Sequence, residues 1–243
     1  DGLQTEQIGW AKAQLDTWLI RAEDQTNNTS VATNGGYTIA ASSGAACSDD
    51  SWGNTAAGPA GRIWHTAVWT GSEMIVWGGS EGGADIATGW KYNPSTDTWT
   101  PTNMANNPGP RRLHTAVWTG NEMIVWGGLY NTSYVSAGGR YNPGTDSWVL
   151  TSGLPANRAS HTALWTGSEM IIWGGYNGSY LNSGGRYNPN TDSWTATSTS
   201  NAPSARDSHT AVWRGNGMII WGGYSDSTGD VNTGRRSNPN TDT

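Results

Sequence analysis

The amino-acid sequence predicts an all-β repeat fold, from its composition and from a motif that recurs four times. The chain has 243 residues with 34 glycines, 16 tryptophans and 9 tyrosines, while phenylalanine is absent and only 13% of the residues are charged. Abundant glycine with regularly spaced aromatic residues and few charges is typical of β-repeat proteins rather than of helical or disordered chains. The length allows one large domain, or one domain with an appended segment.

Four segments align without gaps, and each runs from an arginine to a Trp-Gly-Gly triplet. The segments are 62–79, 111–128, 158–175 and 206–223. Each begins with Arg-x-x-His, and the four histidines are spaced 49, 47 and 48 residues apart. A second block, Tyr-Asn-Pro-x-Thr-Asp-x-Trp, follows the first three segments at 92–99, 141–148 and 187–194. A recurrence at about 48 residues indicates one supersecondary unit that is repeated along the chain.

The pattern within each unit predicts four β-strands. In the first repeat, the first strand is expected at His-Thr-Ala-Val-Trp, before a tight Thr-Gly-Ser-Glu turn. The second strand, Met-Ile-Val-Trp, is almost wholly apolar, as expected where neighbouring units cover both of its faces. The third strand lies before the Asn-Pro-x-Thr-Asp turn, and the last tryptophan of the unit marks the fourth, outermost strand. The Gly-Gly pair that follows the second strand allows a close approach of two backbones.

These residues resemble the kelch repeat. Arg-x-x-His, a strand that ends in Gly-Gly, and Tyr-Asn-Pro-x-Thr-Asp-x-Trp follow one another in the order of that family, with asparagine where the family usually has aspartate. The resemblance covers about residues 49–243. It implies a β-propeller in which each repeat forms one four-stranded blade, and the first strand of each blade lines the central channel. A fold of this kind does not by itself imply an activity.

The N-terminal segment, residues 1–48, has a different pattern from the propeller repeats at 49–243. Apolar residues at helical spacing predict an amphipathic helix within residues 2–24, namely Ile8, Ala11, Leu15, Trp18 and Leu19. A polar loop and a short strand at 36–41 are expected to follow. The helix is expected to cap the propeller or a sheet, and the alternative is a helix for assembly or anchoring.

The position of Trp52 predicts how the last blade is completed. The fourth repeat ends at Thr243, just before its expected tryptophan, while Trp52 lies 47 residues before Trp99 and therefore in the same register. The strand around Trp52 is expected to pair with the last blade, so that four blades close a ring without an open edge. Two alternatives remain open: the chain is part of a larger ring, or the strand is donated to another subunit in a homo-oligomer or filament.

Composition also limits the partners and the compartment. The formal net charge of −6 and the isoelectric point near 5.0 disfavour nucleic acid and anionic membranes, because both bind basic surfaces. Cys47 is the single cysteine, so neither an intrachain disulfide nor a cysteine-cluster metal site is expected. The sequence has no apolar run of about 18 residues that would span a membrane. A first residue of Asp1 rather than methionine favours an exported product, at an extracellular, cell-surface or periplasmic location.

The repeated charged residues have a ligand-binding interpretation and a structural one. Four arginines could form a cationic ring at the channel mouth that binds a carboxylate or sulfate: Arg62, Arg111, Arg158 and Arg206. Their recurrence in every blade favours hydrogen bonds between blades, because a substrate site is normally asymmetric. The four repeated histidines would bind a metal only if they converged at one level, so no metal site is predicted. Basic residues before the Tyr-Asn-Pro blocks are expected to pair with turn acids.

The connections between the second and third strands differ among the repeats, and they leave the blade on the same face as the linkers between blades. Variable loops on a regular scaffold are where a binding site is expected. These loops carry tyrosines among asparagine, serine and aspartate, namely Tyr130, Tyr134, Tyr176, Tyr180 and Tyr224. Such loops suit stacking on sugar rings or the recognition of a protein, and ordinary solvent-exposed loops have a similar composition.

The sequence contains no Gly-x-Ser-x-Gly, His-Glu-x-x-His or P-loop motif. No catalytic residue and no cofactor is therefore predicted. The favoured function is a non-enzymatic, extracytoplasmic binding or structural module for a protein or glycan ligand. One alternative is a subunit of a cell-surface filament that uses residues 1–52 for contacts between subunits. Another is a carbohydrate-active kelch enzyme of the sialic acid mutarotase or copper radical oxidase kind, although the oxidase needs a Cys–Tyr cross-link and Cys47 lies outside the repeats.

Overall fold

The computed structural model describes residues 53–153 and 155–238, which belong to one compact unit, Gly53–Thr243. The predictions for the N-terminal helix, the strand at 36–41, Cys47 and the Trp52 strand lie outside the described residues. The described residues form strands, turns and loops without a helix, which confirms the all-β prediction. Within them there is accordingly no helix with the length and hydropathy to cross a membrane.

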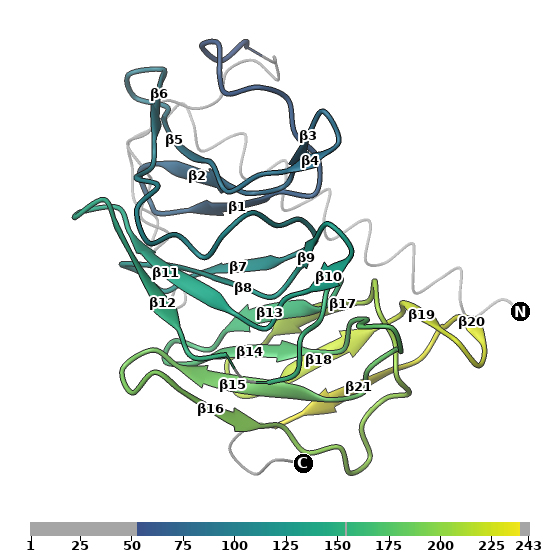
Figure 1. Ribbon diagram of the computed structural model, residues 1–243. Helices are drawn as coiled ribbons and strands as arrows, with labels where there is room; N and C mark the ends of the chain where they lie inside the picture. The colour runs from purple at the N-terminus through teal and green to yellow at the C-terminus, as the bar shows by residue number, and fades with distance from the viewer. Residues whose placement is uncertain (1–52, 154, 239–243) are drawn as a thin grey trace, which may run out of the picture. The chain divides into compact units, whose positions relative to one another are not determined.

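Four antiparallel sheets follow one another along the chain, one for each repeat, and we call them blades 1 to 4 (Figure 1). Blade 1 contains β1 (Thr66–Trp69), β2 (Met74–Trp77), β5 (Gly89–Asn93) and β6 (Thr98–Pro101). Blade 2 contains β7 (Thr115–Trp118), β8 (Met123–Trp126), β11 (Gly138–Asn142) and β12 (Ser147–Thr151). Blade 3 contains β13 (Thr162–Trp165), β14 (Met170–Trp173), β15 (Gly184–Asn188) and β16 (Ser193–Ala196). The described strands of blade 4 are β17 (Thr210–Trp213), β18 (Met218–Trp221) and β21 (Gly234–Ser237).

Short hairpins occupy three of the four connections between the second and third strands, where the sequence predicted only loops. They are β3 (Ser80–Glu81) with β4 (Ala84–Asp85), β9 (Leu129–Tyr130) with β10 (Ser133–Tyr134), and β19 (Tyr224–Ser225) with β20 (Gly229–Asp230). In blade 3 a single bridge between Tyr176 and Tyr180 takes the place of the hairpin. Each connection is therefore partly ordered by backbone pairing.

The Gly-Gly pair makes the close approach that the sequence predicted. Gly79 has a φ of +97°, and a Cβ atom on it would lie 2.6 Å from the carbonyl oxygen of Ile63. The backbone N–H of Gly79 also donates to the carbonyl oxygen of Arg111, at 2.9 Å, and so joins blade 1 to blade 2. A side chain at this position would combine an unfavourable backbone conformation with a steric clash.

The hydrophobic core lies between blades, and each of its clusters joins one blade to the next. Ile75 and Trp77 of blade 1 pack in one cluster with Met123 of blade 2. The corresponding clusters join blade 2 to blade 3 and blade 3 to blade 4. The Met-Ile-Val-Trp strands are buried because each blade covers a face of its neighbour, and each fully buried large side chain contributes about 1.5–3 kcal/mol.

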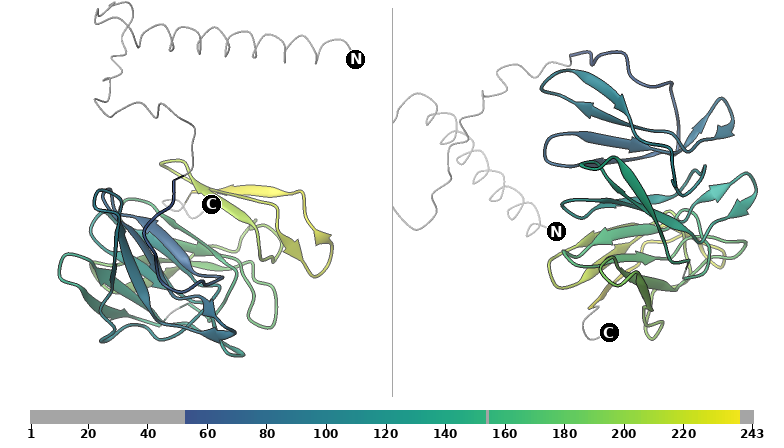
Figure 2. Two further views of the ribbon diagram at one scale, coloured as in Figure 1. Left: turned by 90° about the horizontal axis from the view of Figure 1, so that it is seen from above. Right: turned by 60° about the vertical axis from the view of Figure 1, so that its left-hand side comes forward.

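The first strands of successive blades contact one another: β1 contacts β7, β7 contacts β13, and β13 contacts β17. Figure 2 shows the same succession of blades in two further views. Among the described residues, no comparable contact joins β17 to β1. Closure of the ring through the Trp52 strand stays a prediction, because that strand is outside the described residues.

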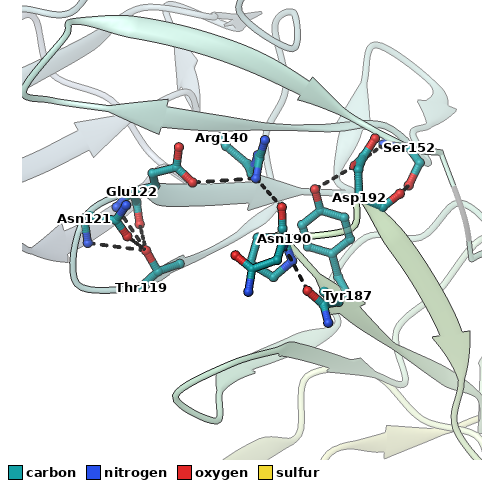
Figure 3. A network of polar contacts seen from close by, with 10 residues as sticks. Thr119, Asn121, Glu122, Arg140, Ser152, Tyr187, Asn190 and Asp192 are labelled. Atoms are coloured by element: carbon teal, nitrogen blue, oxygen red, sulfur yellow. Dashed lines mark hydrogen bonds and ion pairs between the residues drawn. The ribbon is translucent and has the colours of Figure 1, made fainter.

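A polar network joins blade 2 to blade 3 at the ends of their strands (Figure 3). The Arg140 guanidinium lies 3.8 Å from the Glu122 carboxylate and donates a hydrogen bond to the carbonyl oxygen of Pro189 in blade 3. The Asp192 carboxylate accepts hydrogen bonds from the Tyr187 hydroxyl at 2.7 Å and from the backbone N–H of Ser152 at 3.0 Å. The expected pairing of a basic residue with a turn glutamate thus occurs at Arg140, and it supports the scaffold.

Candidate functional site

The repeated arginines bind backbone carbonyl groups of their own blades. Nη1 of Arg158 donates to the carbonyl oxygens of Gly174 at 3.0 Å and Ser183 at 2.6 Å. Arg111, Arg158 and Arg206 are each 1% exposed. Burial lowers the pKa of Arg111 and of Arg158 to about 10. Equivalent bonds occur in all four blades, from Arg62, Arg111, Arg158 and Arg206. These contacts favour the structural interpretation over an anion-binding ring, because the donor groups serve the scaffold.

The repeated histidines join neighbouring blades. Nε2 of His114 lies 2.9 Å from the Thr66 hydroxyl oxygen, and the imidazole packs edge-on against Trp77 with 5.2 Å between ring centroids. The same contacts recur at His161 and His209. Burial lowers the pKa of His114 to about 3. The described residues contain no group of three or more His, Cys, Asp and Glu side chains that could hold a metal ion.

Four of the five predicted tyrosines lie in one continuous row across three blades, which we call the tyrosine row. It consists of Tyr134, Tyr176, Tyr180 and Tyr224. The ring centroids of successive members are 5.9, 4.9 and 5.6 Å apart, and the rings are tilted or edge-to-face. Such geometry is favourable for aromatic pairs. Tyr130, the fifth residue, lies on β9, is 43% exposed, and makes none of these ring contacts.

Backbone pairing fixes the members of the tyrosine row. In blade 3 the backbone N–H of Tyr176 donates to the Ala159 carbonyl oxygen at 2.9 Å, and the reverse bond measures 3.0 Å. In blade 4 the backbone N–H of Tyr224 donates to the Asp207 carbonyl oxygen at 3.0 Å. Ala159 and Asp207 occupy the same repeat position, directly after the repeated arginine. In blades 3 and 4 the segment of the buried arginine and the tyrosine loop are therefore held together.

An open cavity of about 390 Å³ lies beside the tyrosine row. Its lining includes Tyr176, Tyr180, Ser204, Ser225 and Asp226. Burial raises the pKa of the Tyr180 hydroxyl above its ordinary value, and the negative charge of Asp207 adds to this shift. The hydroxyl is protonated at neutral pH, as an ordinary tyrosine is, and can donate a hydrogen bond. The arrangement offers aromatic faces, hydroxyl groups and the Asp226 side chain to a ligand.

The structure also reveals an ion pair that the sequence interpretation missed. Nη1 of Arg112 lies 2.6 Å from one carboxylate oxygen of Asp85, and the backbone N–H of Asn131 donates to the other at 2.7 Å. The guanidinium also lies over the Trp64 ring, with its carbon 5.6 Å from the ring centroid. Arg112 occupies the same repeat position as Ala159 and Asp207. The residue at this position varies among the repeats, although the Arg-x-x-His segment around it is constant. That variation was the feature of the sequence that could have pointed to the ion pair.

The comparisons with known proteins agree with the repeat architecture. A family model described as the KLHDC2/KLHL20/DRC7 kelch-repeats domain matches residues 47–223, which is more than half of the chain. The search of the curated proteins found no match. Kelch domains mediate protein binding, so at this level the chain is a protein-binding β-propeller module. With its repeated blades and this match, the chain belongs to the kelch-repeat family.

Proposed function

We propose that the chain is a non-enzymatic binding module whose tyrosine row recognises a protein segment that carries arginine or lysine. The observation that carries this proposal is the continuous row of four tyrosines from three blades. Tyrosine supplies a large, rigid contact surface at a low cost in conformational entropy, and it is enriched among residues that dominate binding energy.

The charges around the row support a cationic ligand. Asp207 lies at the base of the blade 4 loop, and Asp226 lines the adjoining cavity. An arginine or lysine placed over a tyrosine face within about 6 Å gains a cation–π interaction. The same cation can pair with one of these carboxylates, which favours a basic docking segment over an acidic one.

The experiment must distinguish the binding of a protein segment from the binding of a glycan. The immobilised chain is screened against a displayed peptide library and a glycan array, with the Tyr180→Ala variant as a counter-screen. We expect enrichment of peptides with basic residues, weaker binding at higher salt, and loss of these peptides with Tyr180→Ala. Selection of glycans alone, or of peptides that bind the variant equally well, would contradict the proposal. The extracytoplasmic location stays a prediction that cell fractionation can test.

A further inference from the structure

The end of blade 4 exposes side chains that every junction between blades buries. Trp77, Trp126 and Trp173 are at most 2% exposed, whereas the equivalent Trp221 on β18 is 56% exposed. Its neighbour Val212 is also 56% exposed. We call this surface the end face, and it consists of Thr210, Val212, Ile219 and Trp221.

The beginning of blade 1 exposes the opposite half of the same junction. His114, His161 and His209 are each 5% exposed, whereas the equivalent His65 is exposed. Trp69 on β1 is 53% exposed. We call this surface the start face, and it consists of His65, Ala67, Trp69 and Met74.

The three internal junctions show how a start face fits an end face. In each one the threonine of the earlier blade contacts the histidine of the later blade, at 2.8–2.9 Å between oxygen and Nε2. The same histidine packs edge-on against the tryptophan that ends the second strand of the earlier blade. Thr210 and Trp221 supply these two groups on the end face, and His65 supplies their partner on the start face.

The path of the chain into blade 1 also points to a preceding blade. The backbone N–H of Ala56 donates to the Asp97 carboxylate at 2.8 Å, as that of Asn103 donates to Asp146 at 3.0 Å. Asn103 follows the outer-strand residue Trp99 by four positions, and Ala56 follows Trp52 by four. The segment that follows Trp52 therefore docks on blade 1 as the segment after an outer strand docks on the next blade.

A cavity in blade 4 lies where another junction holds the side chain of an outer-strand tryptophan. Trp77 of blade 1 packs against Trp148 on the outer strand of blade 2, with ring centroids 5.3 Å apart. The equivalent Trp173 of blade 3 lines an open cavity of about 560 Å³ together with Met218 and Ile220 of blade 4. The third strand of blade 4, β21, also lines this cavity through Arg235 and Ser237.

We propose that a second copy of this chain docks head to tail, with the start face of each copy on the end face of the other. The open cavity beside Trp173, which blade 4 also lines, then lies at the edge of this junction. Both faces are exposed in the single chain, and among the described strands β17 makes no contact with β1 like those between successive first strands. Two such junctions close a ring of eight blades, and a head-to-tail contact that closes leaves no free face.

The test is the molar mass of the 243-residue chain by light scattering and sedimentation over a range of concentrations. We expect a mass of two chains that dissociates on dilution. The Trp221→Arg variant places a charge in the junction and should have the mass of one chain. Leu150→Arg is the matched control, because Leu150 is 55% exposed on the outer strand β12, and it should keep the mass of two chains.

A mixing experiment keeps the proposal falsifiable even if the substitution in one variant also disturbs its folding. His65→Glu alters the start face and should also give single chains, while an equimolar mixture with Trp221→Arg retains one intact junction and should restore a two-chain species. Circular dichroism checks that each variant folds. A one-chain mass for the unaltered chain at all concentrations, a larger open assembly, or a two-chain Trp221→Arg variant would overturn the proposal.

Discussion

The imidazole Nε2 of His114 lies 2.9 Å from the hydroxyl oxygen of Thr66, and this contact joins blade 2 to blade 1. The histidine is 5% exposed and also packs against the edge of Trp77. Because the two residues are 48 positions apart, the contact links one repeat to the next rather than stabilising a single blade. The stability of the propeller therefore depends on its junctions.

Replacement of a junction histidine should destabilise the fold. His161→Ala removes the partner of the Thr115 hydroxyl and the ring packed against Trp126. The loss of a buried ring and its hydrogen bond is expected to lower the free energy of unfolding by about 2–4 kcal/mol. Urea-induced unfolding, followed by tryptophan fluorescence, measures the change. An exposed substitution such as Leu150→Ala should change it by less than about 0.5 kcal/mol, and equal effects of the two would refute this role.

The same histidines should make stability depend on pH. Burial lowers the pKa of His114 to about 3 and of His209 to about 4 in the folded chain, whereas the ordinary value is 6.5. As the pH falls below 6.5, the unfolded chain binds protons at these residues and the folded chain does not. The contribution of these histidines to the free energy of unfolding should therefore be fully present above pH 6.5. It should decline progressively as the pH falls towards 4. Melting temperatures across this range measure the effect.

Asp207 should change the pH dependence of stability in the opposite direction to the histidines. The experiment must therefore separate its contribution from theirs. Burial raises the pKa of its carboxyl group, so its contribution to stability is present at low pH and is lost as the pH rises through the folded value. A His114→Asn variant isolates the histidine contribution, and its melting temperature should fall less steeply between pH 6.5 and pH 4. An unchanged slope in that variant would contradict the assignment.

Removal of a repeated arginine should destabilise the blade that it belongs to. Arg158→Met leaves the buried carbonyl oxygens of Gly174 and Ser183 without this donor, and the expected cost is about 2–4 kcal/mol. Arg214→Met is the control, because Arg214 is exposed in the turn between β17 and β18. Chemical unfolding compares the two variants. If Arg158→Met kept full stability, the scaffold role of the arginine would be wrong.

The Gly-Gly pair should not accept a side chain. Gly128 has a φ of +105°, and a Cβ atom would lie 2.7 Å from the carbonyl oxygen of Arg112. Gly128→Ala is therefore expected to cost about 2 kcal/mol or more. In the Gly61→Ala control the added Cβ meets no atom within 4 Å, so calorimetry should show little change. Similar melting temperatures for the two variants would contradict the steric argument.

The blades could be predicted from the sequence because each is specified locally. The apolar Met-Ile-Val-Trp strands, the tight turns and the Gly-Gly pair recur with the same spacing, and each determines a strand or its boundary. The resemblance to the kelch repeat then supplied the arrangement of blades, which periodicity alone does not determine. The short hairpins β3–β4, β9–β10 and β19–β20 were missed, because two-residue strands in Ser- and Gly-containing loops carry little pattern.

The candidate site could be predicted in part. Variable loops that carry tyrosine indicated a candidate binding face, and four of the five tyrosines do lie together in the structure. The absence of Tyr130 from the row could not be predicted, since the sequence pattern places all five tyrosines in equivalent variable loops. The Arg112–Asp85 pair joins residues 27 positions apart in different blades, and only the junction between those blades brings them into contact.

The measurement that tests the central claim most directly is the dissociation constant of a selected basic peptide for three chains, by isothermal titration calorimetry. The chains are the unaltered protein, Tyr180→Ala in the tyrosine row, and Tyr130→Ala as an exposed tyrosine outside the row. Loss of a binding-dominant tyrosine costs about 2 kcal/mol or roughly 30-fold in affinity, and we expect this for Tyr180→Ala while Tyr130→Ala changes affinity less than about twofold. Equal affinities for all three chains, or a greater loss with Tyr130→Ala, would contradict the tyrosine row as the binding site.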